Sequence, residues 1–261
     1  MSQETNELET NVVYNEDCLI GMERIPDNSI DMILCDLPYA TTKASHDKLI
    51  PYDKLWEQYK RIIKKNGAIV LFAQPPFDKT LACSNLEWFK YEWVWVKEQG
   101  TGHLNSKFAP MKKHENILVF SKSAASYVKD ASNAMNYYPI MSEGTPYKQY
   151  CGRASDNYDT KNYRKVLTEN KGTRYPTDVL EFQRDKIKVH PTQKPVALAE
   201  YLIKTYTKEG DIVLDNCMGS GTTALAAIHT NRRYIGFELN EKFYDICMER
   251  INGEFVQNTL F

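Results

Sequence analysis

The sequence lacks the features of a membrane-spanning, secreted or disulfide-stabilised protein. No run approaches the roughly 20 consecutive apolar residues of a membrane helix. The first eleven residues, MSQETNELETN, have neither a basic start nor an apolar run, so we expect no signal peptide. The six cysteines are scattered without a Cys-x-x-Cys pair, which argues against a metal site or a disulfide framework. We therefore expect a cytoplasmic protein that holds no metal.

An excess of positive charge is also missing. The 33 Lys and Arg residues are balanced by 34 Asp and Glu residues, and the formal net charge is −1. Such a chain is not a generally basic coat for nucleic acid, so any DNA-binding surface has to be a local patch. Hydrophobic residues make up 42% of the 261 residues. This share predicts a sizeable core, in one large α/β domain or in one domain with an insertion.

Apolar runs alternate with amphipathic helical patterns along most of the chain. We expect strands over residues 12–16, 29–36, 68–73, 91–97, 116–122, 211–215 and 234–238. We expect helices over residues 52–65 and 222–230, from Pro195 onward, and after Asn240. This alternation is typical of a parallel or mostly parallel sheet with helices on both faces.

Residues 123–189 break the pattern. Apolar periodicity fades there, and tyrosines are interleaved with lysines and arginines. We therefore expect this segment to be an insertion with a separate role. Residues 1–122 and 190–261 are expected to form two halves of one domain, because only about forty residues follow Gly221 and earlier residues have to complete the sheet.

Two stretches place carboxylates at the ends of strands. In CDLPYA, Asp36 directly follows an apolar run; loops at strand ends often carry chemistry, but an Asp in a turn is also an ordinary turn former. In VLDNCMGSGTTALAA, Asp215 ends a strand before a glycine-rich turn, and Glu238 ends the next strand. A carboxylate in that place can bind the ribose hydroxyls of an adenosine.

The glycine turn alone leaves several interpretations open. Gly219 and Gly221 let the backbone approach a ligand closely, and Gly219-x-Gly221-x-x-Ala224 fits the dinucleotide-binding fingerprint. The same pattern would fit a nicotinamide or flavin enzyme. It would also fit a glycine that only caps a helix, with Glu238 as an ordinary surface acid. Ligands of open α/β sheets bind outside the carboxyl ends of the strands. We therefore expect Asp36 and Asp215 to border one pocket.

In combination, these motifs resemble those of the amino-methylating DNA methyltransferases that use S-adenosylmethionine. Asp36-Leu37-Pro38-Tyr39 is similar to the Asp/Asn/Ser-Pro-Pro-Tyr catalytic signature, with Leu37 in place of the first proline. Residues 215–223 are similar to the cofactor signature Asp-x-Phe-x-Gly-x-Gly-Thr-Thr, with Cys217 in place of Phe. HPTQKP at 190–195 and NEDCL near the start also match. The order of the motifs resembles the circularly permuted class beta.

The resemblance implies a Rossmann-like methyltransferase sheet with a target-recognition insertion at 123–189. It implies site-specific methyl transfer from S-adenosylmethionine to the exocyclic N6 of an adenine that has left the duplex. Asp36 is expected to accept one N–H of that amine and the Leu37 carbonyl the other, so that the nitrogen lone pair is localised. Pro38 is expected to stiffen the turn, and Tyr39 to stack on the base.

The resemblance also assigns the cofactor-binding residues. Asp17 is expected to bind the adenine amino group, Glu238 the ribose, and Asp215 the amine of the methionine part. Lys194 and Thr222 are expected to hold the methionine carboxylate. The other residues that the resemblance places around the cofactor are Cys18, Thr192, Cys217, Gly219, Gly221 and Thr223.

Basic residues in two segments are candidates for contacts with double-stranded DNA. Three belong to a loop that should border the cleft, and three to the insertion; they are Lys107, Lys112, Lys113, Arg153, Arg164 and Arg174. For any single arginine of the insertion, a solvated surface role is the simpler interpretation. Members of the family often dimerise and some work beside a separate restriction endonuclease, but the chain shows neither an interface signature nor a nuclease motif.

Several alternatives stay open at this point. Asp at the first position of the catalytic motif usually accompanies adenine and Ser usually accompanies cytosine, so cytosine N4 is the nearest rival target. RNA or a protein amine is a more distant substrate. A nicotinamide-dependent oxidoreductase and a non-catalytic DNA-binding module are rivals from other classes.

Overall fold

The computed structural model describes residues 9–40, 48–125, 130–151, 166–185 and 193–258. They form two compact units. The larger combines the described residues of Met1–Tyr138 and Asp178–Phe261, and the smaller those of Pro139–Thr177. In this part of the chain, no helix combines the length and apolar character that crossing a membrane requires.

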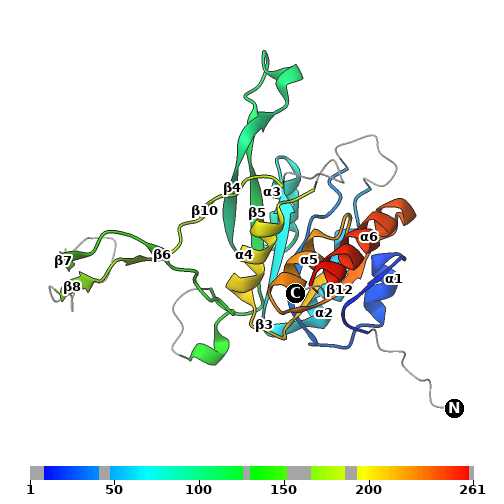
Figure 1. Cartoon of the computed structure of the whole chain (residues 1–261), viewed down its shortest axis with the longest axis horizontal. Coiled ribbons are helices and arrows are strands. Elements are labelled where there is room, and N and C mark those ends of the chain that lie inside the picture. Colours follow the sequence, from blue (N-terminus) through cyan, green and yellow to red (C-terminus); the bar gives the residue numbers. More distant parts are fainter. Residues whose placement is uncertain (1–8, 41–47, 126–129, 152–165, 186–192, 259–261) are drawn as a thin grey trace. The chain divides into compact units, whose positions relative to one another are not determined.

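The larger unit is built on an eight-stranded sheet with the order β1-β12-β11-β2-β3-β5-β4-β10. Figure 1 labels β12, β3, β5, β4 and β10 of this sheet. In that order the strands span Val12–Tyr14, Arg233–Phe237, Ile212–Asp215, Ile30–Cys35, Ile63–Ala73, Lys112–Phe120, Phe89–Thr101 and Val179–Glu181. Neighbours pair in parallel except where β5 pairs with β3 and β4. The expected mostly parallel sheet is therefore confirmed.

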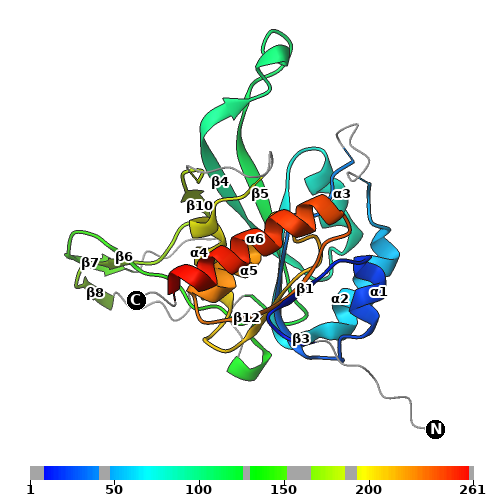
Figure 2. The ribbon, with the colours of Figure 1, turned by 45° about the vertical axis from the view of Figure 1, so that its right-hand side comes forward.

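Helices cover both faces of this sheet. One face carries α4 (Val196–Tyr206), α5 (Thr222–His229) and α6 (Glu241–Asn258), which lie together in Figure 2. The other face carries α1 (Cys18–Glu23), α2 (Tyr52–Ile62) and α3 (Phe77–Ser84). Successive side chains of a strand point to opposite faces. Met32 and Leu34 of β2 accordingly pack with the first set, and Ile33 and Cys35 with the second.

The helices differ from the sequence expectation in two ways. The helix expected over 52–65 ends at Ile62, because Ile63 is extended (φ −71°, ψ 136°) and starts β3 at once. The helices α1 and α3 were not expected. They have 6 and 8 residues, which is too few turns for a clear hydrophobic periodicity.

A long hairpin of β4 and β5 extends away from the helices of the larger unit (Figures 1 and 2). β4 runs to Thr101, four residues beyond the strand expected over 91–97, and β5 starts at Lys112. The segment expected to be a loop between these strands is therefore partly strand. Its end, residues 102–111, contains a short 3-10 helix at His103–Asn105.

The smaller unit consists of short antiparallel pairs. β6 (Ser142–Glu143) pairs with β9 (Thr173–Arg174), and β7 (Tyr147–Cys151) pairs with β8 (Val166–Asn170). This unit lies within the segment 123–189 that the sequence marks as an insertion. Residues 179–181 of that segment instead form β10 at the edge of the main sheet.

Candidate functional site

Three acidic residues stand where neighbouring parallel strands end. Asp36 directly follows β2, Asp215 is the last residue of β11, and Glu238 directly follows β12. β2, β11 and β12 are adjacent and parallel. Their carboxyl ends therefore share one edge of the sheet, which is where ligands bind in open α/β folds.

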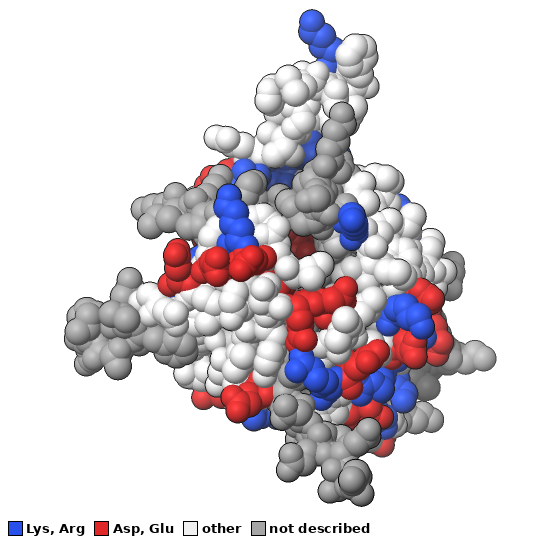
Figure 3. Space-filling model, turned by 90° about the vertical axis from the view of Figure 1, so that its right-hand side faces the viewer, with Lys and Arg blue, Asp and Glu red and all other residues white. Residues whose placement is uncertain are grey.

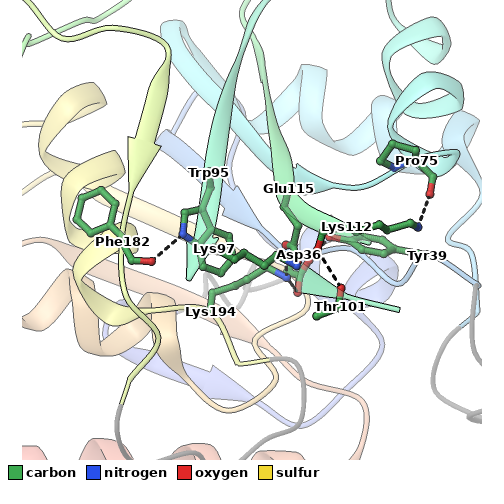
Figure 4. A network of polar contacts seen from close by, with 10 residues as sticks. All are labelled: Asp36, Tyr39, Pro75, Trp95, Lys97, Thr101, Lys112, Glu115, Phe182 and Lys194. Carbon is green, nitrogen blue, oxygen red and sulfur yellow. Dashed lines mark hydrogen bonds and ion pairs between the residues drawn. The ribbon is translucent and has the colours of Figure 1, made fainter. Parts of the chain in front are cut away.

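The Asp36 carboxylate uses both oxygens in this structure. The Tyr39 hydroxyl donates a hydrogen bond of 2.6 Å to Oδ1, and Lys194 Nζ donates one of 2.7 Å to Oδ2 (Figure 4). Tyr39 stacks on Phe77 of α3 with ring centroids 4.8 Å apart. Leu37 is buried with the side chains of α2 and α3. Asp36 is thus held from two sides, by its own turn and by a lysine 158 positions away.

Behind Lys194 lies a second carboxylate, which the sequence did not single out. Glu115 Oε2 of β5 is 3.1 Å from Lys194 Nζ, and Glu115 Oε1 forms an ion pair with Lys97 of β4. Lys97 and Glu115 are 5% and 8% exposed, so their charges are nearly removed from water. The four side chains form a continuous array of alternating charge from β4 to Asp36 (Figure 4).

The array keeps Lys194 and Glu115 charged. Burial favours the neutral forms of Lys194 and Glu115, but neighbouring opposite charges outweigh that effect. Asp36 and Glu115 raise the pKa of Lys194, and Lys194 with Lys97 lower the pKa of Glu115. Burial, followed by the adjacent Asp36, raises the pKa of Tyr39 well above its ordinary value. Tyr39 is therefore a neutral hydrogen-bond donor.

The glycine turn is organised by the other two strand-end carboxylates. The backbone N–H of Gly219 donates to Glu238 Oε2 at 2.7 Å. Asp215 accepts from the Cys217 N–H at 3.0 Å and from the Thr223 hydroxyl at 2.6 Å. These bonds tie the turn to β11 and β12.

Glycine is required at two points of this turn. Gly219 and Gly221 have positive φ, 55° and 82°, a region that residues with a Cβ rarely adopt. Gly221 is the N-cap residue of α5. A Cβ on Gly221 would lie 2.7 Å from Cys247 Sγ in α6.

Asp215 is almost fully buried, with 4% of its surface exposed. Burial raises its pKa to about 6, although its hydrogen bonds with Thr223 and Cys217 oppose the shift. A buried carboxylate with so little compensation would gain from a cationic partner. Asp215 is therefore suited to bind an ammonium group.

A cluster of thiols lies beside the turn. The Asn216 side-chain amide donates to the Sγ atoms of Cys18 and Cys217, each at 3.6 Å. Asp17 caps α1 by accepting a hydrogen bond of 2.8 Å from the Leu19 N–H. Burial raises the pKa of Cys35 to about 12, which keeps this thiol protonated. The cluster therefore packs rather than supplying a nucleophilic thiolate.

The remaining candidates are dispersed. Thr222 lies at the start of α5, and its hydroxyl is 3.5 Å from the Lys194 carbonyl oxygen. Lys107, Lys112 and Lys113 are exposed on the hairpin, and Lys112 Nζ donates to the Pro75 carbonyl at 3.1 Å. Arg174 lies in the smaller unit, 4.8 Å above the Tyr147 ring. Thr192, Arg153 and Arg164 lie outside the described residues.

Sequence reasoning missed Glu115, Lys97 and Phe77. Glu115 carried one usable signal, because HENILVF places an acid directly before an apolar strand. Lys97 had a similar position at the end of YEWVWVK. Only the antiparallel pairing of β4 with β5 shows that these two opposite charges meet.

Comparison with known proteins gives a consistent assignment. The N6/N4 methyltransferase family model, described as DNA methylase, matches residues 30–249. The chain is 28% identical over 253 residues to the type II methyltransferase M.HpaI of Haemophilus parainfluenzae, which covers 90% of this chain and 72% of that protein. It is 30% identical over 262 residues to the DNA adenine methyltransferase YhdJ of Escherichia coli, with 94% and 83% covered.

Solved structures share the fold. The M1.HpyAVI–SAM complex superposes with a TM-score of 0.58 at 24% identity, covering 91% of this chain and 98% of that one. The cytosine-N4-specific PvuII DNA methyltransferase superposes with a TM-score of 0.61 at 16% identity, covering 95% and 94%. Because the family model spans more than half of the sequence and its motifs lie at one sheet edge, the chain belongs to the DNA methylase family of N6/N4 methyltransferases.

Proposed function

We propose that this protein transfers a methyl group from S-adenosylmethionine to the exocyclic N6 of adenine in double-stranded DNA. One observation carries the proposal: the Asp36 carboxylate lies in a turn with Tyr39 at the same sheet edge as the Asp215–Glu238 glycine turn. One motif can therefore hold an amine while the other holds a cofactor. The family assignment and the M1.HpyAVI–SAM complex support the choice of cofactor.

The glycine turn fits S-adenosylmethionine. When bound, this cofactor supplies an electrophilic methyl group on a cationic sulfonium. The buried Asp215 carboxylate would hold the methionine ammonium, because burial raises its pKa and a cationic partner would stabilise its charged form. Glu238 is placed for the ribose hydroxyls, and Gly219 and Gly221 keep the turn free of side chains. Asp17, Cys18, Cys217 and Thr223 complete the turn's surroundings.

Asp36 activates the amine by accepting a hydrogen bond from it. The lone pair of an adenine N6 is delocalised into the ring, and acceptors that favour developing charge on nitrogen lower the barrier. The Leu37 backbone carbonyl is the second acceptor. The Leu37 side chain packs into the core, so leucine in place of proline leaves that carbonyl in the chain. The carboxylate and the carbonyl act as hydrogen-bond acceptors, and the proton that the methylated nitrogen loses passes to solvent.

The amine competes with the present partners of Asp36 for its carboxylate. Oδ1 is bonded to Tyr39 and Oδ2 to Lys194. Lys194 has an alternative partner, because Glu115 Oε2 lies 3.1 Å from its Nζ atom in an ion pair without good hydrogen-bond geometry. Transfer of Lys194 to Glu115 frees Oδ2 and leaves Asp36 a stronger acceptor. Glu115 is thus a positioning residue, acting through Lys194.

Adenine is favoured over cytosine by the identity of residue 36. In the methyltransferases that the motifs resemble, Asp at this position usually accompanies adenine as the target base. The relative YhdJ, at 30% identity, is named as an adenine methyltransferase. The PvuII enzyme is cytosine-N4-specific, but at 16% identity it supports the fold alone. Cytosine N4 offers the same chemistry to the same turn, so the product has to be identified directly.

Nucleoside mass spectrometry identifies the product. Purified protein and S-adenosylmethionine with a deuterated methyl group are incubated with unmethylated plasmid DNA, which is then digested to nucleosides. Labelled N6-methyladenine is the expected product. Labelled N4-methylcytosine would overturn the base assignment. No labelled base, when calorimetry shows that S-adenosylhomocysteine binds, would contradict a DNA substrate.

A further inference from the structure

We propose that the end of the β4–β5 hairpin is an apolar wedge that enters the stacked bases of the DNA duplex. The wedge is formed by Leu104 and Phe108, and Met111 follows them directly before β5. This inference rests on the proposed function for its substrate, double-stranded DNA, and it assigns a contact surface away from the catalytic turn.

Apolar side chains at the hairpin end are unusually exposed. Leu104 and Phe108 are 84% and 90% exposed, more than any other large hydrophobic residue that the structure describes, and Met111 is 45% exposed. Single exposed apolar residues are ordinary, but several close together at a projecting tip mark a contact with a partner. Phe, Leu and Met are also the side-chain types that proteins insert between base steps.

The charge around these residues selects a polyanion as the partner. From Gln99 to His114 the chain has Lys107, Lys112 and Lys113 and no Asp or Glu, although the whole chain carries a formal net charge of −1. Figure 3 shows the outer part of the projection in white and blue, without red. Lysines that flank an apolar tip can neutralise phosphates while the tip contacts bases.

The backbone of the tip has a defined form. The N–H groups of Phe108 and Ala109 donate to the Asn105 carbonyl at 2.9 and 3.0 Å, and Ser106 N–H donates to His103 at 3.1 Å. The Thr101 hydroxyl joins the strands by donating to the Lys112 carbonyl at 3.3 Å. A tip organised in this way loses little conformational freedom when it inserts, which favours binding.

The hairpin also fixes how far from the target base the wedge can act. Glu115, which touches Lys194 in the catalytic array, is seven residues from Phe108 along the chain. At about 3.3 Å per residue the tip lies within about 23 Å of the array. Since base pairs are about 3.4 Å apart, this distance corresponds to about seven base pairs of duplex.

Replacement of the wedge by small polar residues tests the proposal. The variant L104S/F108S is compared with wild type for the KM of DNA, for fluorescence energy transfer between dyes at the two ends of a duplex, and for binding of S-adenosylhomocysteine. The matched control is L86S, which replaces a leucine that is 64% exposed on a loop after α3. Because both sites are exposed, neither variant is expected to disturb folding.

The expected result is selective. The KM of DNA rises at least about tenfold in L104S/F108S, as for the loss of base stacking, and the protein-induced change in energy transfer is lost. Cofactor binding stays as in wild type, and L86S behaves as wild type throughout. The variant K107A/K113A instead reduces the slope of log K for DNA binding against log salt concentration by the amount expected for about two lost phosphate contacts. It keeps the protein-induced change in energy transfer.

Three outcomes overturn the proposal. The first is an unchanged KM and energy-transfer signal in L104S/F108S. The second is conversion of a wild-type dimer to a monomer by these substitutions, with DNA distortion retained, which would assign the tip to a second copy of the chain. The third is binding by wild type without any distortion of the duplex. If wild type distorts DNA but transfers no methyl group, the proposed function fails and the wedge stands.

Discussion

Lys194 is the residue on which the state of Asp36 depends. Its ammonium lies 2.7 Å from Asp36 Oδ2 and 3.1 Å from Glu115 Oε2, with 10% of its side chain exposed. A single positive charge therefore compensates parts of two carboxylates, and moving it toward one weakens its hold on the other. In the proposed function, movement of Lys194 toward Glu115 frees Asp36 to accept a hydrogen bond from the amine.

Replacing Glu115 should hold Lys194 on Asp36. The substitution E115Q is expected to lower the single-turnover rate of methyl transfer about tenfold, because the amine competes less well for Asp36. It should also destabilise the fold by roughly 3 kcal/mol, because Lys97 is left buried without its partner. Stability is measured by urea unfolding, and the rate with saturating DNA and S-adenosylmethionine.

Two further variants separate these effects. K97M/E115Q removes both charges of the buried pair, so stability should return while the rate stays low. D31N weakens a different ion pair with a mostly buried aspartate, Lys64–Asp31, away from the site, and should leave the rate unchanged. Recovery of the wild-type rate in K97M/E115Q would contradict a positioning role for Glu115.

Asp215 gives opposite pH dependences for stability and cofactor affinity. Burial raises its pKa to about 6 from the ordinary 3.8, so the folded state binds a proton that the unfolded state has released between these values. The contribution of Asp215 to the free energy of unfolding therefore falls as pH rises from about 4 to about 6. In the proposed function the ionised Asp215 carboxylate holds the methionine ammonium, so the cofactor affinity should rise over the same range.

Calorimetry with S-adenosylhomocysteine checks this prediction. The Kd should increase by up to about tenfold for each pH unit below 6 in wild type. D215N should bind weakly at every pH and lose this dependence. An equal pH dependence in wild type and D215N would show that another group titrates.

At the scale of residues, sequence could locate the strand-end carboxylates of the candidate site but not the side chains that they contact. Asp36, Asp215 and Glu238 were found because each follows an apolar run that predicts a strand. The ion pair of Asp36 with Lys194 could not be predicted, because the two residues are 158 positions apart in the sequence. Lys194 was expected at the methionine carboxylate, and this role stays a prediction; in the structure its ammonium lies between Asp36 and Glu115.

At the scale of elements, the start of α5 decides whether the cofactor turn can form. Gly221 has φ 82°, and a Cβ there would lie 2.7 Å from Cys247 Sγ of α6. Gly210 has almost the same φ, 81°, with nothing within 4 Å of an added Cβ. Substitution of Gly210 therefore reports the free-energy cost of the left-handed backbone alone. Substitution of Gly221 adds the cost of the clash with Cys247.

Alanine at each glycine tests this difference. G210A should destabilise the fold by about 1 kcal/mol through its left-handed backbone and leave S-adenosylhomocysteine binding unchanged. G221A should cost about 3 kcal/mol, because Cys247 or α5 has to shift, and should weaken binding. Urea unfolding and calorimetry measure the two effects. Equal losses in both variants would contradict the importance of the α5–α6 contact.

The elements that sequence predicted are those with strong periodicity or long apolar runs. The helices α2, α4, α5 and α6 carried such signals, whereas α1 and α3 span 6 and 8 residues and gave none. The antiparallel direction of β5 could not be predicted from the sequence either, because a buried strand has the same apolar pattern in either direction. The array of Lys97 and Glu115 depends on that direction.

At the scale of the whole molecule, the chain joins two distant segments into one sheet. β11 lies between β12 and β2, so Asp215 from the C-terminal part and Asp36 from the N-terminal part meet at one edge. The smaller unit, Pro139–Thr177, contributes no strand to this sheet in the described residues. Its strands pair only with one another.

Replacement of residues 139–177 by a short Gly-Ser linker should therefore leave the larger unit folded. S-adenosylhomocysteine should bind with its wild-type Kd. The KM of DNA should rise at least about tenfold if these residues carry target contacts, since phosphate and base contacts each add to affinity. Loss of cofactor binding in a monodisperse, folded variant would contradict the independence of the two units.

The most direct test of the account is the chemistry of Asp36 itself. Single-turnover methyl transfer is compared between wild type and D36N, with S-adenosylmethionine affinity measured on the same preparations. Asn keeps the size of the side chain but removes its charge. We predict a rate at least about 100-fold lower in D36N, as for loss of a key transition-state contact, with an unchanged cofactor Kd. Methyl transfer by D36N at the wild-type rate would contradict the role of this carboxylate.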